Sequence, residues 1–265
     1  MTHDTPSSAP VVVLSASRFG GNYLLDMLAR ARPSDWIFND LFHPGAKVRP
    51  EEADRLSLRP DDLADMLRDN PSEAWRHVRQ SASAAGVQAV VKVYYYHFPR
   101  DAALWETLHR TARIVHLIRR DLLASFVSRQ RAETDGKWAV SAKEARRMPR
   151  PAPMTVNPAM AHRFVHMRRE EIEWARSAFQ TANYSEIYFE DIARGPYRCA
   201  RTIAEVFGPV SAPTIYDGSG LLRLRRNSLA EVLTNYAEVA HLDAPVARLT
   251  APDPGKGLDP VRALQ

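Results

Sequence analysis

The stretch VVVLSASRFGGNYLLDML, residues 11–28, decides the fold. Residues 11–14 form a short apolar run, rich in β-branched side chains, that is typical of a buried parallel strand. A turn containing Ser, Arg and Gly follows, and residues 22–32 then carry an apolar face with helical spacing. Such a strand-turn-helix unit directs backbone N–H groups and a helix N-terminus at one place, the arrangement that binds phosphate. The stretch therefore predicts an α/β protein with a phosphate-binding loop.

The alternation of strand and helix continues along the chain. Further strands are predicted at 89–94, 113–118 and 186–189, and WIFNDLFHPG (36–45) starts with another short one. Further helices are predicted at 121–132 and 158–182. We expect a P-loop-like fold with a central parallel sheet of four or five strands, flanked by helices on both faces, whose ligands bind beyond the carboxyl ends of the strands.

Composition narrows the class of protein. The 265 residues are 45% hydrophobic, enough for one α/β domain that needs no disulfide or structural metal. Lys+Arg exceed Asp+Glu by 36 to 31, and only five of the 36 are lysine; arginine is the cation suited to phosphate and sulfate. The interpretation as a nucleic-acid-binding protein would depend on this positive charge alone, because the sequence contains no nucleic-acid recognition motif. We therefore expect no nucleic-acid partner.

The domain boundaries follow from proline content and periodicity. We expect a disordered segment at 1–10, one domain at 11–242 with a mobile loop near 139–157, and a Pro-rich tail at 243–265. A single cysteine, Cys199, and the lack of any apolar stretch near 18 residues predict a cytoplasmic protein without an integral membrane segment. The sequence does not indicate the oligomeric state.

Two motifs point to anion binding. The loop after the first strand is not a Walker A motif, because it has no lysine and Asn22 stands where a magnesium-binding hydroxyl is needed. In RIVHLIRRDLLASFVSRQRAE (113–133), Arg120 leaves a strand and Ser128 follows eight residues later, about two helical turns along. An arginine and a serine so placed can hold one phosphate from two sides.

Together these segments resemble the PAPS-dependent sulfotransferases, most of all the bacterial carbohydrate enzymes of the trehalose and nodulation-factor type. RAETDGKW (131–138), IYFEDIARGP (187–196) and LRLRRNSLAEVLTNYAEV (222–239) are similar to further segments of that family, in the same order. The resemblance implies transfer of a sulfuryl group from 3′-phosphoadenosine 5′-phosphosulfate (PAPS) by in-line displacement, leaving 3′-phosphoadenosine 5′-phosphate (PAP). No metal is expected, since arginines take the place of magnesium.

The resemblance also implies the residues that bind the cofactor. Those gripping the 5′-phosphosulfate would be Ser17, Arg18, Phe19, Gly20, Gly21, Asn22 and Tyr23. Arg120 and Ser128 would hold the 3′-phosphate, and the basic loop with Arg225, Arg226 and Asn227 would close late as a lid. Phe19 and Gly21 replace hydroxyl-bearing positions of the family's loop, so a degenerate nucleotide-binding protein of the same fold is the alternative, with a nucleotide kinase carrying an atypical loop as a further one.

The catalytic and acceptor-binding groups are expected near the same edge of the sheet. Arg18 would stabilise the charge on the leaving phosphate, and Lys92 would contact the sulfonate or support the base. Asp40, matching the family's carboxylate, is the preferred base, with His43 as its competitor and His97 as a third candidate. The side chains predicted to line the acceptor pocket are Tyr94, Tyr95, His97 and Trp138. The acceptor would be a hydroxyl of a carbohydrate, a glycolipid at a membrane surface, or a small metabolite.

Overall fold

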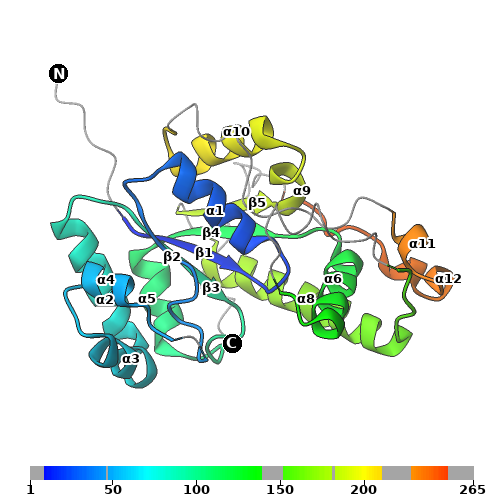
Figure 1. Ribbon diagram of the computed structural model, residues 1–265, viewed down its shortest axis with the longest axis horizontal. Helices are drawn as coiled ribbons and strands as arrows, with labels where there is room; N and C mark the ends of the chain where they lie inside the picture. The colour runs from blue at the N-terminus through cyan, green and yellow to red at the C-terminus, as the bar shows by residue number, and fades with distance from the viewer. Residues whose placement is uncertain (1–8, 46, 139–151, 181–182, 211–227, 250–265) are drawn as a thin grey trace.

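The computed structural model describes residues 9–45, 47–138, 152–180, 183–210 and 228–249 (Figure 1). Its centre is a sheet of five parallel strands in the order β2-β3-β1-β4-β5. The strands are β1 (Val11–Ser15), β2 (Trp36–Phe38), β3 (Ala89–Tyr94), β4 (Arg113–Ile118) and β5 (Tyr184–Tyr188). The predicted parallel α/β sheet is thus confirmed, with β5 starting two residues before the expected 186.

β1 lies in the middle of the sheet and all five of its residues are buried. Ser15 is in register with Tyr94 of β3, and Leu14 with His116 of β4. The carboxyl ends of β1, β3 and β4 therefore meet at one edge, where parallel α/β proteins bind their ligands.

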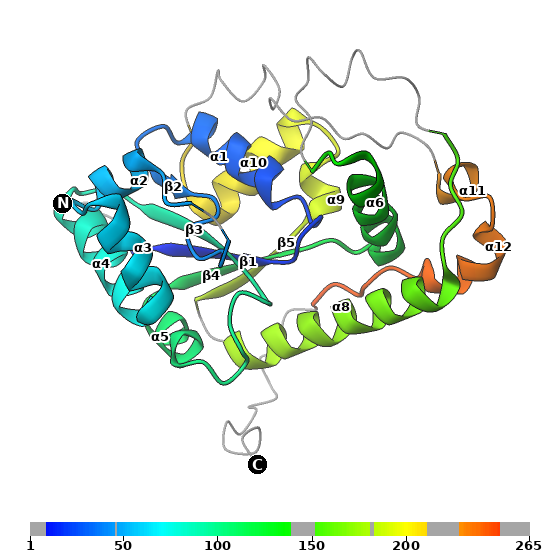
Figure 2. The same cartoon turned by 60° about the horizontal axis from the view of Figure 1, so that its bottom comes forward.

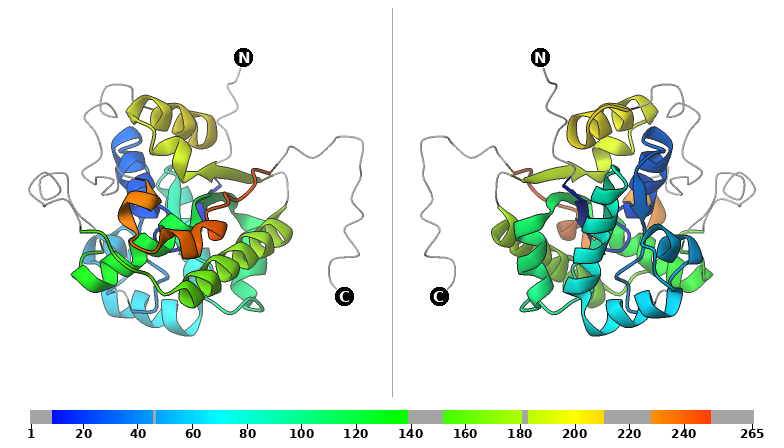
Figure 3. Two further views of the ribbon diagram at one scale, coloured as in Figure 1. Left: turned by 90° about the vertical axis from the view of Figure 1, so that its right-hand side faces the viewer. Right: turned by 90° about the vertical axis from the view of Figure 1, so that its left-hand side faces the viewer.

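Helices cover both faces of the sheet (Figures 2 and 3). One face packs against α1 and α10, and the other against α4, α5 and α8. The helices are α1 (Gly21–Ala31), α2 (Pro50–Arg55), α3 (Pro60–Asp69), α4 (Pro71–Ala84), α5 (Ala103–Thr111), α6 (Leu122–Asp135), α8 (Pro158–Phe179), α9 (Phe189–Ile192), α10 (Pro196–Phe207), α11 (Leu229–Val232) and α12 (Tyr236–Val239), followed by the 3-10 turn η2 (Ala240–Leu242). Each face thus has its own hydrophobic cluster.

Local sequence sets the helix starts that matter for the site. The Asp121 carboxylate accepts from the Ala124 N–H at 2.7 Å and caps α6. Asn157 caps α8 through the Met160 N–H, and Pro158 occupies the first helical position. α1 begins differently, because its N-cap is Gly20 and no side chain caps it. The N-terminus of α1 is therefore left open toward the sheet edge.

The sequence predicts a mobile loop near 139–157 and a Pro-rich tail at 243–265. The described parts of both segments, residues 152–157 and 243–249, pack against the rest of the domain. In the loop, the Met154 N–H donates to the Val232 carbonyl at 2.9 Å, and Val156 is buried. In the tail, Val246 is buried, and residues 243–249 pack between α8 and β5 (Figure 2). Residues 139–151 and 250–265 lie outside the described part of the chain. Over the described ranges, none of the helices combines the length and apolar content that crossing a bilayer requires.

Candidate functional site

The loop between β1 and α1 has a strained backbone held by its surroundings. Arg18 has a φ of 68° and Gly20 a φ of 93°, both in the left-handed region. A Cβ on Gly20 would lie 2.2 Å from the Phe189 ring, so only glycine fits there. The loop therefore packs directly on Phe189, the first residue of α9, which follows β5 without a break.

The N–H groups of this loop divide into two sets. The Phe19 N–H donates to the Ala16 carbonyl at 3.2 Å, and the Phe19 side chain is fully buried. The first helical bond of α1 runs from the Leu24 N–H to the Gly20 carbonyl, so the N–H groups of Gly21, Asn22 and Tyr23 have no acceptor within the helix. Phe19 is thus corrected from a cofactor-binding residue to an anchor of the loop in the core, and the open N–H groups are those of the first turn.

Arg18 links this loop to α6. Its Nε and Nη2 lie 3.0 and 2.9 Å from Ser128 Oγ, and its Nη1 donates to the carbonyl of Trp138. Burial lowers the pKa of Arg18 from its usual high value. Since an arginine stays protonated at any ordinary pH, the structure places a fixed cation between the loop and the serine predicted for the 3′-phosphate.

The two arginines after β4 take different positions. Arg119, which sequence reasoning did not assign to the site, is 7% exposed, donates from Nη1 to the Arg18 carbonyl at 3.0 Å and lies over the Phe189 ring. Arg120 is half-buried and donates from Nε to the Val246 carbonyl at 2.7 Å. Arg119 thus holds the strained loop residue, and the side chain of Arg120 is fixed by the C-terminal segment.

Lys92 joins the loop to the strand end that carries the candidate base. Its side chain is 0% exposed, and its Nζ lies 2.9 Å from Asp40 Oδ1 and donates to Asn22 Oδ1 at 2.6 Å. Burial lowers the pKa of Lys92, and the Asp40 carboxylate opposes that shift. A Cβ on Gly21 would lie 2.9 Å from Lys92 Cδ. Gly21, which departs from the family's loop, therefore makes room for Lys92, and Asn22 binds its ammonium group.

The two histidines near Asp40 both use Nδ1 as an acceptor. His43 Nδ1 accepts from the Gly45 N–H at 3.1 Å, and His97 Nδ1 accepts from the Tyr94 N–H at 3.3 Å. The two rings meet edge to face with centroids 5.4 Å apart. Burial, together with His43 and Lys92, lowers the pKa of His97 to about 3. His97 is therefore neutral near pH 7, with its proton on Nε2, which makes it a donor there and not a base.

The three tyrosines after Lys92 differ in burial: Tyr94 is half-buried, Tyr95 is buried and Tyr96 is exposed. Tyr94 and Tyr96 stack with ring centroids 5.2 Å apart, and Tyr96 is 45% exposed. Tyr95 is 4% exposed, and its hydroxyl lies 2.5 Å from Nε2 of the buried His116. Tyr95 is thus corrected from an acceptor-pocket residue to a core residue, because its ring is buried and packs edge to face on Phe19 and His116.

Of the remaining predicted site residues, Ser17 and Trp138 lie near Arg18, and the basic loop lies outside the described residues. Ser17 precedes Arg18, with its hydroxyl hydrogen-bonded to Tyr96, and Trp138 is 53% exposed. Arg225, Arg226 and Asn227 fall within 211–227, outside the described residues.

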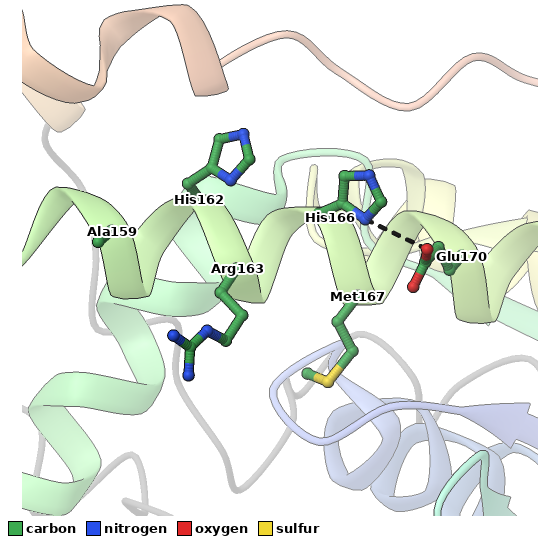
Figure 4. A pocket seen from close by; sticks show the side chains of 6 residues that line it. All are labelled: Ala159, His162, Arg163, His166, Met167 and Glu170. Atoms are coloured by element: carbon green, nitrogen blue, oxygen red, sulfur yellow. Dashed lines mark ion pairs between the residues drawn. The ribbon is translucent and has the colours of Figure 1, made fainter.

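A hollow of about 570 Å³ lies on α8, away from these residues (Figure 4). Its lining includes His162 and His166, one helical turn apart with ring centroids 6.2 Å apart, and Glu170, which pairs with His166. Within the described ranges, no group of three or more His, Cys, Asp or Glu side chains could hold a metal ion. None of the side chains that line the hollow belongs to the site predicted at the sheet edge.

Comparison with known proteins identifies the family. The Stf0 sulphotransferase family matches residues 69–215, more than half of the chain. The chain belongs to the Stf0 sulphotransferase family. The matched region contains Lys92, Arg120 and Ser128, whereas Arg18 and Asp40 precede it. The chain is accordingly a sulfotransferase by family.

One solved structure supports the fold. The sulfotransferase domain from the curacin biosynthetic pathway is similar over 89% of this chain and 83% of its own, with a TM-score of 0.50 and 14% identity. The sulfotransferase domain from the Synechococcus PCC 7002 olefin synthase covers 88% of this chain and 85% of its own, with a TM-score of 0.49 and 15% identity. No curated protein matches the chain significantly. At such low identity, the likeness to the curacin domain shows the fold of this Stf0 member and nothing finer.

Proposed function

We propose that this Stf0 member transfers a sulfuryl group from PAPS to a hydroxyl of a carbohydrate, glycolipid or small metabolite. The observation that carries the proposal is the pair of hydrogen bonds from Arg18 to Ser128. They join the loop predicted for the 5′-phosphosulfate to the helix predicted for the 3′-phosphate, although 110 residues separate them. A nucleotide phosphorylated at both positions is the ligand that such a double site fits.

The residues present fit the proposed cofactor. Gly20 and Gly21 have no Cβ to shield the first turn of α1, and no side chain caps that turn. Its open N–H groups and positive dipole end favour a phosphate. Arg18 and Lys92 supply two cations beside the turn, one partly and one fully buried, where charge interactions are stronger than in water. The turn would hold the 5′-phosphosulfate, and Ser128 with Arg120 the 3′-phosphate.

Bound PAPS would supply an activated sulfuryl group. The protein's contribution is positioning and charge stabilisation, as in phosphoryl transfer. Arg18 stabilises negative charge at the loop but, being permanently protonated, donates no proton there. Lys92 holds the Asp40 carboxylate by an ion pair, with Asn22 fixing the ammonium group from the other side.

Asp40 is the proposed base that takes the proton of the acceptor hydroxyl. Its side chain is 41% exposed, so a substrate can reach it, and Oδ1 is oriented by Lys92. His43 has its Nδ1 lone pair engaged by the Gly45 N–H, so neutral His43 carries its proton on Nε2 and has no free lone pair. The geometry therefore supports the carboxylate over either histidine.

The stacked Tyr94 and Tyr96 are the proposed acceptor surface. Tyr96 is exposed, and an aromatic face next to a carboxylate suits a sugar or another hydroxyl-bearing ring. Trp138 is also exposed, and its carbonyl accepts a hydrogen bond from Arg18.

A ligand-binding series tests the proposal. The melting temperature is measured with PAP, AMP, ATP with magnesium, and NAD, since a ligand at 100 times its Kd stabilises the native state by about 2.7 kcal/mol. We expect PAP to give the largest shift and to compete with PAPS in a transfer assay that uses labelled sulfate. A larger, magnesium-dependent shift with ATP would favour a kinase instead.

A further inference from the structure

We propose that residues 243–249, here called the strap, position Arg120 and thereby set the preference of the enzyme for a 3′-phosphorylated nucleotide. This inference rests on the proposed function, because it assigns Arg120 to the 3′-phosphate. Neither the family match nor the fold comparison, which covers the chain only as a whole, gives these residues a role.

The strap and Arg120 bind each other in both directions. The Val246 N–H donates to the Arg120 carbonyl at 3.0 Å, and Arg120 Nε donates to the Val246 carbonyl at 2.7 Å. Val246 is 6% exposed and belongs to the main hydrophobic cluster. The carbonyl that fixes the guanidinium is therefore itself anchored in the core.

The bond through Nε has a chemical consequence. A guanidinium has five N–H donors in one plane. The hydrogen bond from Nε to the Val246 carbonyl fixes the orientation of that plane. The four N–H groups of Nη1 and Nη2, at the far end of the side chain, are left to bind a phosphate. A planar pair of terminal nitrogens is the form in which arginine binds a phosphate by two parallel hydrogen bonds. Because the half-buried side chain is held by its Nε, less rotamer entropy remains to be lost when the phosphate binds.

The strap is fastened on both sides of Val246. Before it, Arg169 of α8 donates to the Ala244 carbonyl at 2.8 Å. After it, Arg248 forms two hydrogen bonds of 2.8 and 2.7 Å with the Asp191 carboxylate, and its guanidinium lies over the Tyr188 ring. The partners of the strap in these contacts are Arg169 of α8, Asp191 of α9 and Tyr188 of β5. The strap is therefore held by elements that all follow Arg120 in the chain.

The peptide on the other side of Arg120 is held as well. The Arg120 and Asp121 N–H groups both donate to the Glu190 carboxylate, at 3.0 and 3.1 Å to Oε1. Glu190 therefore fixes the backbone of Arg120, and the strap fixes its side chain. Arg169 and Arg248 are accordingly positioning residues that act through Arg120 without touching the nucleotide.

The experiment uses the full chain and loosens the strap away from Arg120. The variant is R169A/R248A, and the matched control is Arg201→Ala, an exposed arginine on α10 that pairs with Glu205. Calorimetry gives the Kd for PAP and for AMP, which lacks the 3′-phosphate, and the ratio of the two is the preference. Hydrogen exchange at the Val246 N–H reports whether the strap has loosened.

We expect the preference for PAP over AMP to fall by about tenfold in R169A/R248A, the worth of one charged hydrogen bond, and to stay unchanged in R201A. In the Arg120→Ala background the same pair should cause no further loss, because the residue through which the strap acts is gone. A purely structural role would lower AMP and PAP binding equally in both backgrounds.

An unchanged preference with faster exchange at Val246 would overturn the inference. If exchange does not change, Val246→Pro removes the N–H that binds the Arg120 carbonyl, and an unchanged preference in that folded variant overturns it too. A wild-type chain that binds PAP and AMP equally would overturn the proposed function instead, so the two failures are distinguishable.

Discussion

Arg18 Nε and Nη2 both donate to Ser128 Oγ, at 3.0 and 2.9 Å, so one side chain joins the phosphate loop to the middle of α6. A double-mutant cycle of Arg18→Ala and Ser128→Ala should therefore give a coupling free energy of about 1 kcal/mol in urea unfolding. Binding of PAP should weaken by about 1.5–3 kcal/mol for each charged hydrogen bond lost in Arg18→Ala.

Arg18→Lys is the matched control for this pair. It keeps the charge but lacks the planar fork that reaches Ser128 with two nitrogens. We expect it to recover only part of the PAP affinity, measured by calorimetry. Full recovery would show that charge alone matters and that the bidentate contact does not.

Asp40→Asn should lower kcat by about 10²–10⁴-fold, the usual contribution of a general base, while the Kd for PAP stays near that of the wild type. Asp62→Asn, at an exposed aspartate of α3 that pairs with Arg59, is the control and should leave both values unchanged. The measurement is sulfate transfer to a panel of hydroxyl acceptors. An active Asp40→Asn enzyme alongside an inactive His43→Gln enzyme would give the role to His43.

Gly21→Ala should displace Lys92, because the added Cβ would lie 2.9 Å from Lys92 Cδ. Moving Nζ away from Asp40 and Asn22 by an ångström is expected to lower turnover by up to about 100-fold. The crowding should also cost about 1–3 kcal/mol of unfolding free energy. Gly45→Ala is the control, since its nearest neighbour would be 3.7 Å away, an ordinary contact. Equal effects of the two substitutions on turnover would contradict the account of Lys92.

The stability of the protein should fall in mild acid because of two buried histidines. Burial lowers the pKa of His97 and of His116 to about 3, from an ordinary value of 6.5. Between those values the unfolded chain binds a proton at each position that the folded chain does not, so unfolding becomes easier as pH falls. Each histidine should cost about 2 kcal/mol between pH 7 and pH 5.

Urea unfolding at pH 7, 6 and 5 measures this dependence. His97→Gln should remove about half of the slope, whereas His166→Gln, on the exposed face of α8, should leave it intact. A slope that His97→Gln does not change would show that His97 accepts a proton in the folded state as readily as in the unfolded one.

The sequence predicts the sheet well because its strands are short apolar runs, each followed by a turn and an amphipathic helix. The helical pattern of residues 121–132 likewise predicts α6, which runs from Leu122 to Asp135. Lys92 and Asp40 meet because Asp40 follows β2 and Lys92 lies near the carboxyl end of β3, its parallel neighbour, and their ion pair measures 2.9 Å.

Other features depend on contacts that no local pattern contains. The close approach of Phe189 to Gly20, and of Val246 to Arg120, joins residues far apart in the chain. Of the two arginines after β4, Arg119 is the one that holds the loop. This depends on the direction of each side chain at the end of the strand. The burial of Tyr95 is a similar case, because β3 ends at Tyr94 and the turn that follows, closed by the His97 N–H on the Tyr94 carbonyl at 3.0 Å, sets the direction of the Tyr95 side chain.

A crystal structure of the complex with PAP tests the central claim most directly. The account predicts the 5′-phosphate at the N–H groups of residues 21–23, and the 3′-phosphate within hydrogen-bond distance of Ser128 Oγ and the terminal nitrogens of Arg120. PAP bound elsewhere, or with its 3′-phosphate turned away from Ser128 and Arg120, would contradict it.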